Sequence, residues 1–126
     1  MKTALLLIAH GSRNAEANGD LFALAEELCQ AGPYALVEAA FLEIAQPTID
    51  VAGQQCVTQG AERVILLPYF LSAGVHVRRD LQNHRARLAT AFPAVEFALA
   101  EPLGRHPLLR EIVLDRAGEV YWSPDG

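Results

Sequence analysis

The fold is decided by the stretch Thr3-Ala-Leu-Leu-Leu-Ile-Ala9 and by the polar His10-Gly-Ser-Arg13 that follows it directly. The first stretch is almost continuously apolar, which predicts a strand buried on both faces, as in parallel sheets. A helix is predicted from about Ala15 to Gln30, because apolar residues recur there at intervals of three or four until Gly32-Pro33 ends the pattern. The sequence therefore opens with a strand, a polar turn and a helix.

The same strand–helix pattern recurs three more times along the chain. Strands that alternate with helices run parallel and are joined by right-handed crossovers. We therefore predict an α/β fold: a small four-stranded parallel sheet flanked by helices, a flavodoxin-like three-layer sandwich with its strands in the order 2-1-3-4. The other predicted strands are residues 36–41, 63–70 and 95–100. Of the other predicted helices, one begins at Pro47 and one extends over residues 77–92. The last begins at His106-Pro107, and its apolar residues are expected to face the core: Leu108, Leu109, Ile112 and Val113.

Length and composition indicate a single globular domain. The chain has 126 residues and a mass of 13.7 kDa, and 52% of its residues are hydrophobic, which excludes intrinsic disorder. We assign residues 1–118 to one α/β domain and residues 119–126 to a C-terminal tail. In that tail, Tyr121 and Trp122 either fold back on the body or contact a second subunit.

Charge and apolar runs exclude several classes of protein. A net charge of −5 and a pI of about 5.3 are unlike those of a nucleic-acid binder. The run from Ala4 to Ala9 is too short to cross a membrane and is not followed by a signal-peptide cleavage site. Cys29 and Cys56 are too few for a disulfide scaffold, and both are expected in the core as small apolar residues. We expect a cytoplasmic protein with no nucleic-acid or membrane partner.

Polar residues follow the predicted strands, where parallel sheets bind their ligands. His10, Glu43 and His76 are equally spaced along the chain, one for each strand–helix unit of about 30 residues. They should therefore lie at the same edge of the sheet. Two imidazoles and a carboxylate would there form either a site for a divalent transition metal or an acid–base cluster.

Each of these residues also has a purely structural interpretation. A His after a strand often only bonds to the backbone, and Glu43 could be a carboxylate of a first helical turn or of the surface. His84, in a charged stretch, is expected to face solvent, and His106, before Pro107, is expected to open a helix.

No sequence motif indicates a nucleotide-binding or phosphate-binding site. The sequence contains no GxGxxG after the first strand and no GxxxxGK(S/T) anywhere. A phosphoryl-receiver domain would carry acidic residues at the ends of the first and third strands, where this chain has His10, Ser72 and His76.

Four blocks of sequence, in order along the chain, carry a resemblance to a known family. They are Leu6-Leu-Ile-Ala-His-Gly-Ser-Arg13, Ala40-Phe-Leu-Glu43 with Gln46-Pro-Thr-Ile49, Val64-Ile-Leu-Leu-Pro-Tyr-Phe-Leu-Ser-Ala-Gly-Val-His76, and Pro102-Leu-Gly-Arg-His-Pro-Leu108. These blocks resemble the sirohydrochlorin chelatases, most closely the small single-domain type related to the cobaltochelatases of the cobalamin pathway. The resemblance extends from about residue 4 to residue 112.

The resemblance implies an enzyme that inserts a divalent metal into sirohydrochlorin in cobalamin or siroheme biosynthesis. The metal, which is cobalt, iron or nickel, is a substrate, and no organic cofactor is implied. In the family, the positions of His10 and His76 bind the metal and act in its insertion, and Glu43 matches a position that is often acidic. Larger members have two such domains facing each other across a cleft, so the resemblance implies a homodimer here.

The tetrapyrrole carries peripheral carboxylates, which arginine side chains pair with well. Small and polar residues in the strand-end loops would let the substrate approach the backbone closely. The candidate substrate-binding residues are Arg13 and Arg105 in the matched blocks, Arg78 and Arg79 beyond them, Ser12 beside His10, and Ser72 and Gly74 ahead of His76.

Two other functions remain open from the sequence. A metal or tetrapyrrole carrier without turnover would use the same residues. A hydrolase or transferase would pair His10 with Ser12 or Glu43, but no acid that could orient the His is evident.

Overall fold

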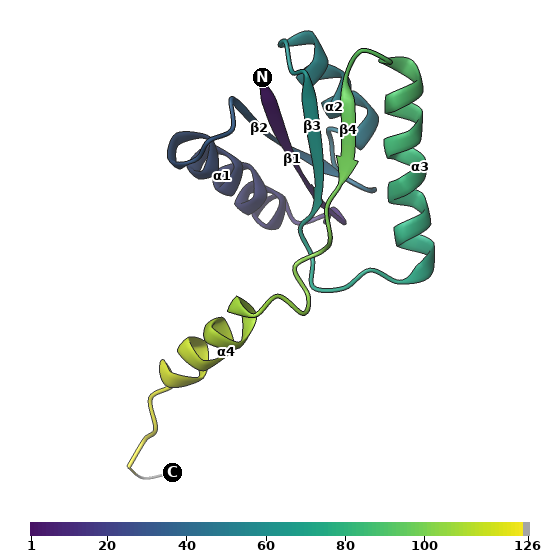
Figure 1. The fold of residues 1–126 in the computed structure, drawn as a ribbon. Helices are drawn as coiled ribbons and strands as arrows, with labels where there is room; N and C mark the ends of the chain where they lie inside the picture. Colours follow the sequence, from purple (N-terminus) through teal and green to yellow (C-terminus); the bar gives the residue numbers. More distant parts are fainter. Residues whose placement is uncertain (125–126) are drawn as a thin grey trace.

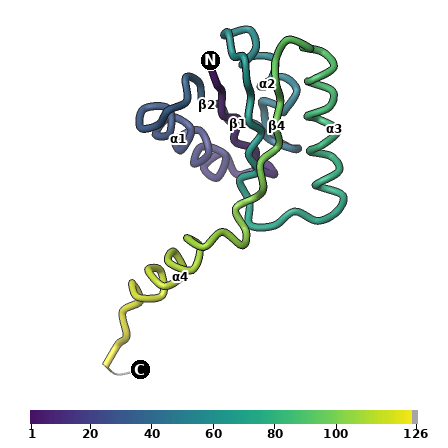
Figure 2. Tube along the Cα trace, in the orientation of Figure 1, coloured from purple at the N-terminus to yellow at the C-terminus, as the bar shows by residue number. Residues whose placement is uncertain are grey.

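The computed structural model describes residues 1–124, and the last two residues of the predicted tail lie outside that range. A sheet lies between two helical layers, and the last helix extends away from this body (Figure 1 and Figure 2). Among the described residues, no helix is long and apolar enough to cross a membrane. The elements are β1 (Thr3–Ala9), α1 (Ala15–Ala31), β2 (Leu36–Phe41), α2 (Ile49–Thr58), β3 (Arg63–Pro68), α3 (Val75–Ala91), β4 (Glu96–Leu99) and α4 (Leu108–Gly118).

The sheet has the predicted topology. Its four strands are parallel and lie in the order β2-β1-β3-β4. β1 is central and pairs with β2 on one side and β3 on the other, which explains why its sequence is apolar almost throughout. The bounds of β1 and β2 match the prediction, whereas β3 and β4 are shorter than predicted.

Alternate residues of β1 pack into two different clusters. Ala4, Leu6 and Ile8 contact the residues of α2 and α3, whereas Leu5 and Leu7 contact those of α1. This follows from the period of two along a strand, which sends neighbouring side chains to opposite faces. The core therefore consists of two layers with the sheet between them.

The two faces of the sheet are covered unequally. α2 and α3 cover one face, while α1 lies against β2 and β1 on the other. On the α1 side, Ile65 and Leu67 of β3 remain half-buried, and Ala98, which pairs with Ile65 in the sheet, is exposed. The α1 side of β3 and β4 is thus the least covered part of the sheet.

Side-chain caps fix where two of the helices begin. The Asn14 side chain accepts a hydrogen bond from the Glu16 N–H, and the Thr48 hydroxyl accepts one from the Val51 N–H. Pro47, predicted to open the second helix, lies one residue before this cap, and the Gln46–Pro47 peptide bond is cis.

The two cysteines differ in burial. Cys56 is buried in the α2–α3 cluster, as predicted, and this burial raises the pKa of its thiol to about 12, with the nearby carboxylate of Glu38 adding to the shift. The prediction that Cys29 lies in the core is wrong, because α1 buries Leu21 and Ala25 and leaves Cys29 exposed.

The predicted packing of the last helix is also wrong. α4 forms as predicted, but within residues 1–124 none of its residues is buried. Leu108, Ile112 and Val113, expected to face the core, are each more than half exposed. The physical reason is its direction, since α4 leaves the body at the end of β4 and extends away from the sheet (Figure 1).

Candidate active site at the strand ends

The loops that follow β1 and β2 are held together through their backbones. The Leu42 N–H donates to the Ala9 carbonyl at 2.9 Å, and the Glu43 N–H donates to the His10 carbonyl at 3.0 Å. These bonds continue the β1–β2 pairing past the sheet. They place the His10 and Glu43 backbones side by side, as the equal spacing along the sequence predicts.

Gly11 is required by this close approach. Its φ of 100° lies in a region that side chains rarely adopt, and a Cβ at this position would overlap the carbonyl oxygen of Glu43. The glycine after His10 therefore lets the loops of two strands meet.

The loops that follow β3 and β4 are joined in the same way. The Leu103 N–H donates to the Phe70 carbonyl at 3.0 Å, and a Cβ on Gly104 would overlap the Leu71 carbonyl oxygen. The Tyr69 N–H donates back to the Ile8 carbonyl at 2.6 Å, which links this pair of loops to β1. All four strand-end loops therefore form one connected edge.

The two candidate histidines lie on this edge with exposed side chains. The His10 ring stacks on Phe70, with ring centroids 4.4 Å apart and planes inclined by 31°. His76 lies within the first turn of α3, where the sequence placed it just before the helix. Their positions leave both imidazoles open to a ligand outside the edge.

The structure does not gather a closed metal site from these residues. Within residues 1–124, no group of three or more His, Cys, Asp or Glu side chains lies close enough to hold one ion. The Glu43 side chain is exposed, and its suggested part in metal binding stays a prediction, as do the metal-binding roles of His10 and His76.

Asn18 is a residue that sequence reasoning missed. Its side-chain oxygen accepts from the Ser12 N–H at 3.0 Å, and its amide donates to the Ser12 carbonyl at 2.7 Å. The Ser12 hydroxyl accepts from the Asn14 N–H at 3.0 Å. Asn18 thus clamps the loop after His10 from the first turn of α1, and Ser12 shapes that loop. The signal available in the sequence was an Asn inside a predicted helix, which favours bonding to nearby backbone.

The candidate arginines divide into two kinds. Arg78 is occupied, because its side chain donates to the Ala73 carbonyl at 3.2 Å and pairs with Glu101 at 3.4 Å. Arg13, Arg79 and Arg105 are exposed, and no ion pair or hydrogen bond within residues 1–124 engages their side chains. Arg13 and Arg105 stand on the strand-end loops and are therefore the cations available to an anionic ligand there.

A hollow of about 600 Å³ lies beside the β3 and β4 loops. Its lining includes Ser72, Arg105 and His106. Gly74 next to it is the N-cap of α3 and provides no side-chain bond, so the first N–H groups of the helix stay available to an anion. A Cβ on Gly74 would meet nothing within 4 Å, so packing does not require glycine there.

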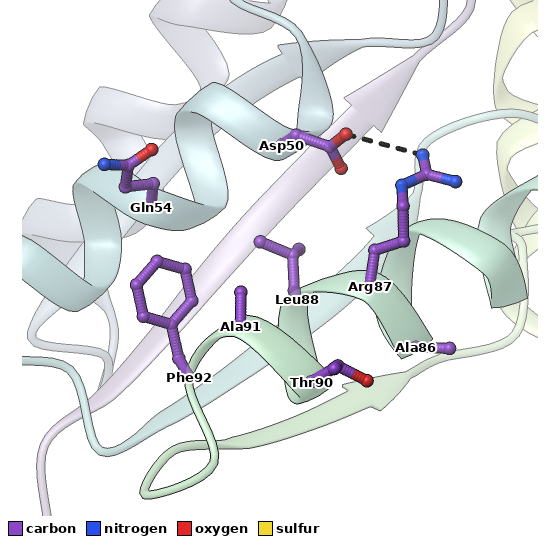
Figure 3. A pocket seen from close by; sticks show the side chains of 8 residues that line it. All are labelled: Asp50, Gln54, Ala86, Arg87, Leu88, Thr90, Ala91 and Phe92. Carbon is purple, nitrogen blue, oxygen red and sulfur yellow. Dashed lines mark hydrogen bonds and ion pairs between the residues drawn. The ribbon is translucent and has the colours of Figure 1, made fainter.

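A more apolar groove lies elsewhere, between α2 and α3 (Figure 3). It has a volume of about 570 Å³, and Leu88 and Phe92 form its floor while Asp50 and Arg87 meet at its rim. This groove belongs to the helical layer rather than to the strand-end edge.

The remaining histidines have structural contacts. The prediction that His84 faces solvent is wrong, because it is half-buried with its Nδ1 3.0 Å from an Asp50 oxygen and 2.7 Å from Arg87. His106 opens α4 as predicted, since its Nδ1 accepts from the Leu108 N–H at 3.1 Å.

Most of the chain and its fold match known proteins. The family model CbiX matches residues 4–120. This chain belongs to the CbiX family. It is 37% identical over 112 residues to a chloroplastic sirohydrochlorin ferrochelatase of Arabidopsis thaliana, and 34% identical over 113 residues to a sirohydrochlorin cobaltochelatase of Sulfolobus acidocaldarius. The fold matches the sirohydrochlorin chelatase SirB from Bacillus subtilis subspecies spizizenii in complex with cobalt, with a TM-score of 0.86 at 29% identity.

These CbiX relatives differ in length. The alignments cover 89% of this chain but 50% of the Arabidopsis protein, and 95% of this chain but 51% of SirB. The Sulfolobus protein is matched over 90% of this chain and 88% of its own length. The chain thus spans about half the length of some CbiX relatives and nearly all of another.

Proposed function

We propose that this chain is a sirohydrochlorin chelatase that inserts cobalt(II) or iron(II), with nickel(II) as a third candidate, into the tetrapyrrole. The observation that carries the proposal is the pair of exposed imidazoles, His10 and His76, on the strand-end edge of a CbiX-family sheet. A closed four-ligand site would retain the ion, whereas exposed ligands suit an ion that must be passed on.

The chemistry of insertion calls for groups that handle both metal and protons. As the divalent ion enters the ring, two pyrrole N–H groups lose their protons and four nitrogens bind the metal. An imidazole can hold the incoming ion or accept one of these protons near neutral pH. His10 and His76 are the two residues proposed for these roles, and Glu43, whose backbone N–H donates to the His10 carbonyl, is the carboxylate proposed to assist them.

The peripheral carboxylates of the substrate need cations. Arg13 supplies one from the loop after β1 and Arg105 another from the segment after β4, and the uncapped start of α3 at Gly74 adds N–H groups. Ser12 and Ser72 lie beside these groups and are proposed as further polar contacts. This arrangement accounts for how a chain of net charge −5 would bind a polyanion, since the cations are local.

The proposed active form is a homodimer. The cytoplasmic location, the lack of an organic cofactor, and the lack of nucleic-acid and membrane partners stay predictions from the sequence.

The test mixes the purified chain with sirohydrochlorin and cobalt(II), or with iron(II) without oxygen, and follows the absorption of the tetrapyrrole. The rate should exceed that of the protein-free mixture. His10→Ala and His76→Ala should each lower it about 100-fold or more, the lower range for losing a proton-transfer group.

His84→Gln is the matched control, because His84 is held by Asp50 and Arg87 in the helical layer. It should retain the rate of the unchanged chain, and circular dichroism should show all three variants folded. A rate equal to the protein-free mixture would overturn the proposal, and metal retained through dialysis against a mild chelator without turnover would indicate a carrier.

A further inference from the structure

The His10 imidazole is oriented by a ring contact and not by a hydrogen bond. It lies against the Phe70 ring, with centroids 4.4 Å apart and planes inclined by 31°. Within residues 1–124 no hydrogen bond or ion pair engages either ring nitrogen of His10. The stacking on Phe70 is therefore the directional contact that this imidazole makes in the described part of the chain.

Histidines that bind metals are usually oriented in another way. The ring nitrogen that does not bind the ion donates to a carboxylate, a carbonyl or water, and this bond fixes both the tautomer and the direction of the ring. His84 and His106 each have a bond through Nδ1, to Asp50 at 3.0 Å and from the Leu108 N–H at 3.1 Å. His10 has no such partner, so packing must orient its ring, and both of its nitrogens stay open.

Phe70 is itself held firmly enough to serve as a support. The Tyr69 N–H donates to the Ile8 carbonyl at 2.6 Å, and the Leu103 N–H donates to the Phe70 carbonyl at 3.0 Å. The Phe70 side chain is half-buried and packs against the α2–α3 cluster. Part of the ring is thus anchored in the core, while part of it meets His10.

The stacking also connects the two candidate histidines. Phe70 belongs to the loop between β3 and α3, and the same loop leads to His76. His10 follows β1, and its backbone is bonded on its other side to the β2 loop through Glu43. The His76 side chain makes no ring contact or hydrogen bond within residues 1–124. His10 is therefore the oriented member of the pair, and it is oriented by the segment that carries the other.

We infer, resting on the proposed function, that Phe70 is a positioning residue for His10 in metal handling. Its ring holds the imidazole in one direction without using either nitrogen, so both nitrogens remain available to the incoming ion and the tetrapyrrole. An imidazole that is already oriented loses less conformational freedom when it binds an ion. The loss for one side chain corresponds to a factor of about 2 to 12 in affinity.

Phe92 provides the matched control. It is half-buried like Phe70 and packs against the same α2–α3 cluster, but it lies at the end of α3 and pairs with Phe97 at a centroid distance of 6.5 Å. Phe→Leu at either position removes the same atoms from the same core. Only the change at Phe70 removes a ring from His10.

The first experiment uses NMR of the histidine rings in the full chain, without metal or tetrapyrrole. Signals of His10 are assigned by their loss in His10→Ala. In the unchanged chain they should be displaced upfield by the ring current of Phe70. Phe70→Leu should abolish that displacement, whereas Phe70→Tyr, which keeps the ring, and Phe92→Leu should retain it. Undisplaced His10 signals in the unchanged chain, or signals that do not change in Phe70→Leu, would overturn the inference.

The second experiment titrates the same variants with cobalt(II) alone. Phe70→Leu should raise the dissociation constant about 2- to 12-fold, and Phe70→Tyr and Phe92→Leu should leave it close to that of the unchanged chain. In a His10→Ala background, Phe70→Leu should have no further effect, because a positioning residue acts only through the group that it positions. Equal weakening with and without His10, or equal weakening by Phe92→Leu, would reduce Phe70 to a core residue and overturn the inference.

The insertion assay gives a third readout. Phe70→Leu should lower kcat for cobalt(II) insertion and leave KM for sirohydrochlorin nearly unchanged, because the tetrapyrrole is held by other groups. An unchanged kcat would count against Phe70, and thermal melting of each variant excludes loss of the fold. Failure of the proposed function would appear separately, as a missing rate in the unchanged chain, while the NMR signals still decide whether Phe70 orients His10.

Discussion

α3 and α4 show how the same sequence pattern leads to two different environments. Both follow a strand-end loop, and both carry apolar residues at helical spacing. α3 buries Leu81 and Leu88 against the sheet, whereas α4 buries no residue within the described part of the chain. The difference lies in the connections: the short loop before α3 returns it to the sheet, and the ordered segment before α4 directs it away. Helical periodicity therefore identifies an apolar side that burial would stabilise, but it does not identify the surface that buries it.

The largest expected effect is on unfolding. Leu81 is 1% exposed, so Leu81→Ala should lower the free energy of unfolding by about 2–5 kcal/mol through lost burial and a cavity. Ile112→Ala removes a similar apolar volume from α4, where Ile112 is 53% exposed, and should leave the free energy of unfolding nearly unchanged. Urea titrations measure the free energy of unfolding of each variant, and an equal loss of stability in Leu81→Ala and Ile112→Ala would contradict the comparison.

A smaller effect is expected at two helical glycines. A Cβ on Gly53 would lie 2.8 Å from a Leu88 methyl group where α2 meets α3, whereas a Cβ on Gly118 would meet nothing within 4 Å. Gly53→Ala should therefore destabilise the chain by about 1–3 kcal/mol through overpacking. Gly118→Ala should be neutral or slightly stabilising, because alanine favours a helix. Thermal melts compare them, and a loss of stability in Gly118→Ala would show that α4 is already tightly packed.

The smallest effect is on amide hydrogen exchange. Amides of α3 near Leu81 and Leu88 should exchange through global unfolding, because they lie over the buried core. Amides of α4 should exchange faster than those of α3, because no α4 residue within residues 1–124 is buried. Exchange measured by mass spectrometry would contradict this if the amides of α4 were protected as strongly as those of α3.

The candidate site was only partly predictable from sequence. The spacing of His10, Glu43 and His76 predicts a common edge, and the backbone bond between Glu43 and His10 is consistent with it. The clamp by Asn18 and the engagement of Arg78 by Glu101 were not predictable, because both depend on which loops come close after folding. The same holds for His84, whose partner Asp50 lies on another helix.

The sequence by itself determined the parallel sheet, its strand order and the resemblance to a chelatase family. Those features depend on local properties: apolar runs, helix stops, and short motifs such as His10-Gly-Ser-Arg13 with a glycine where the backbone has a positive φ. Only the tertiary structure decided where α4 goes, because the direction of a helix depends on the loop contacts before it, here Leu103 with Phe70 and Gly104 with Leu71. A hydrophobic pattern defines a side to be buried, and the three-dimensional path of the chain determines whether the surface that buries it belongs to the same molecule.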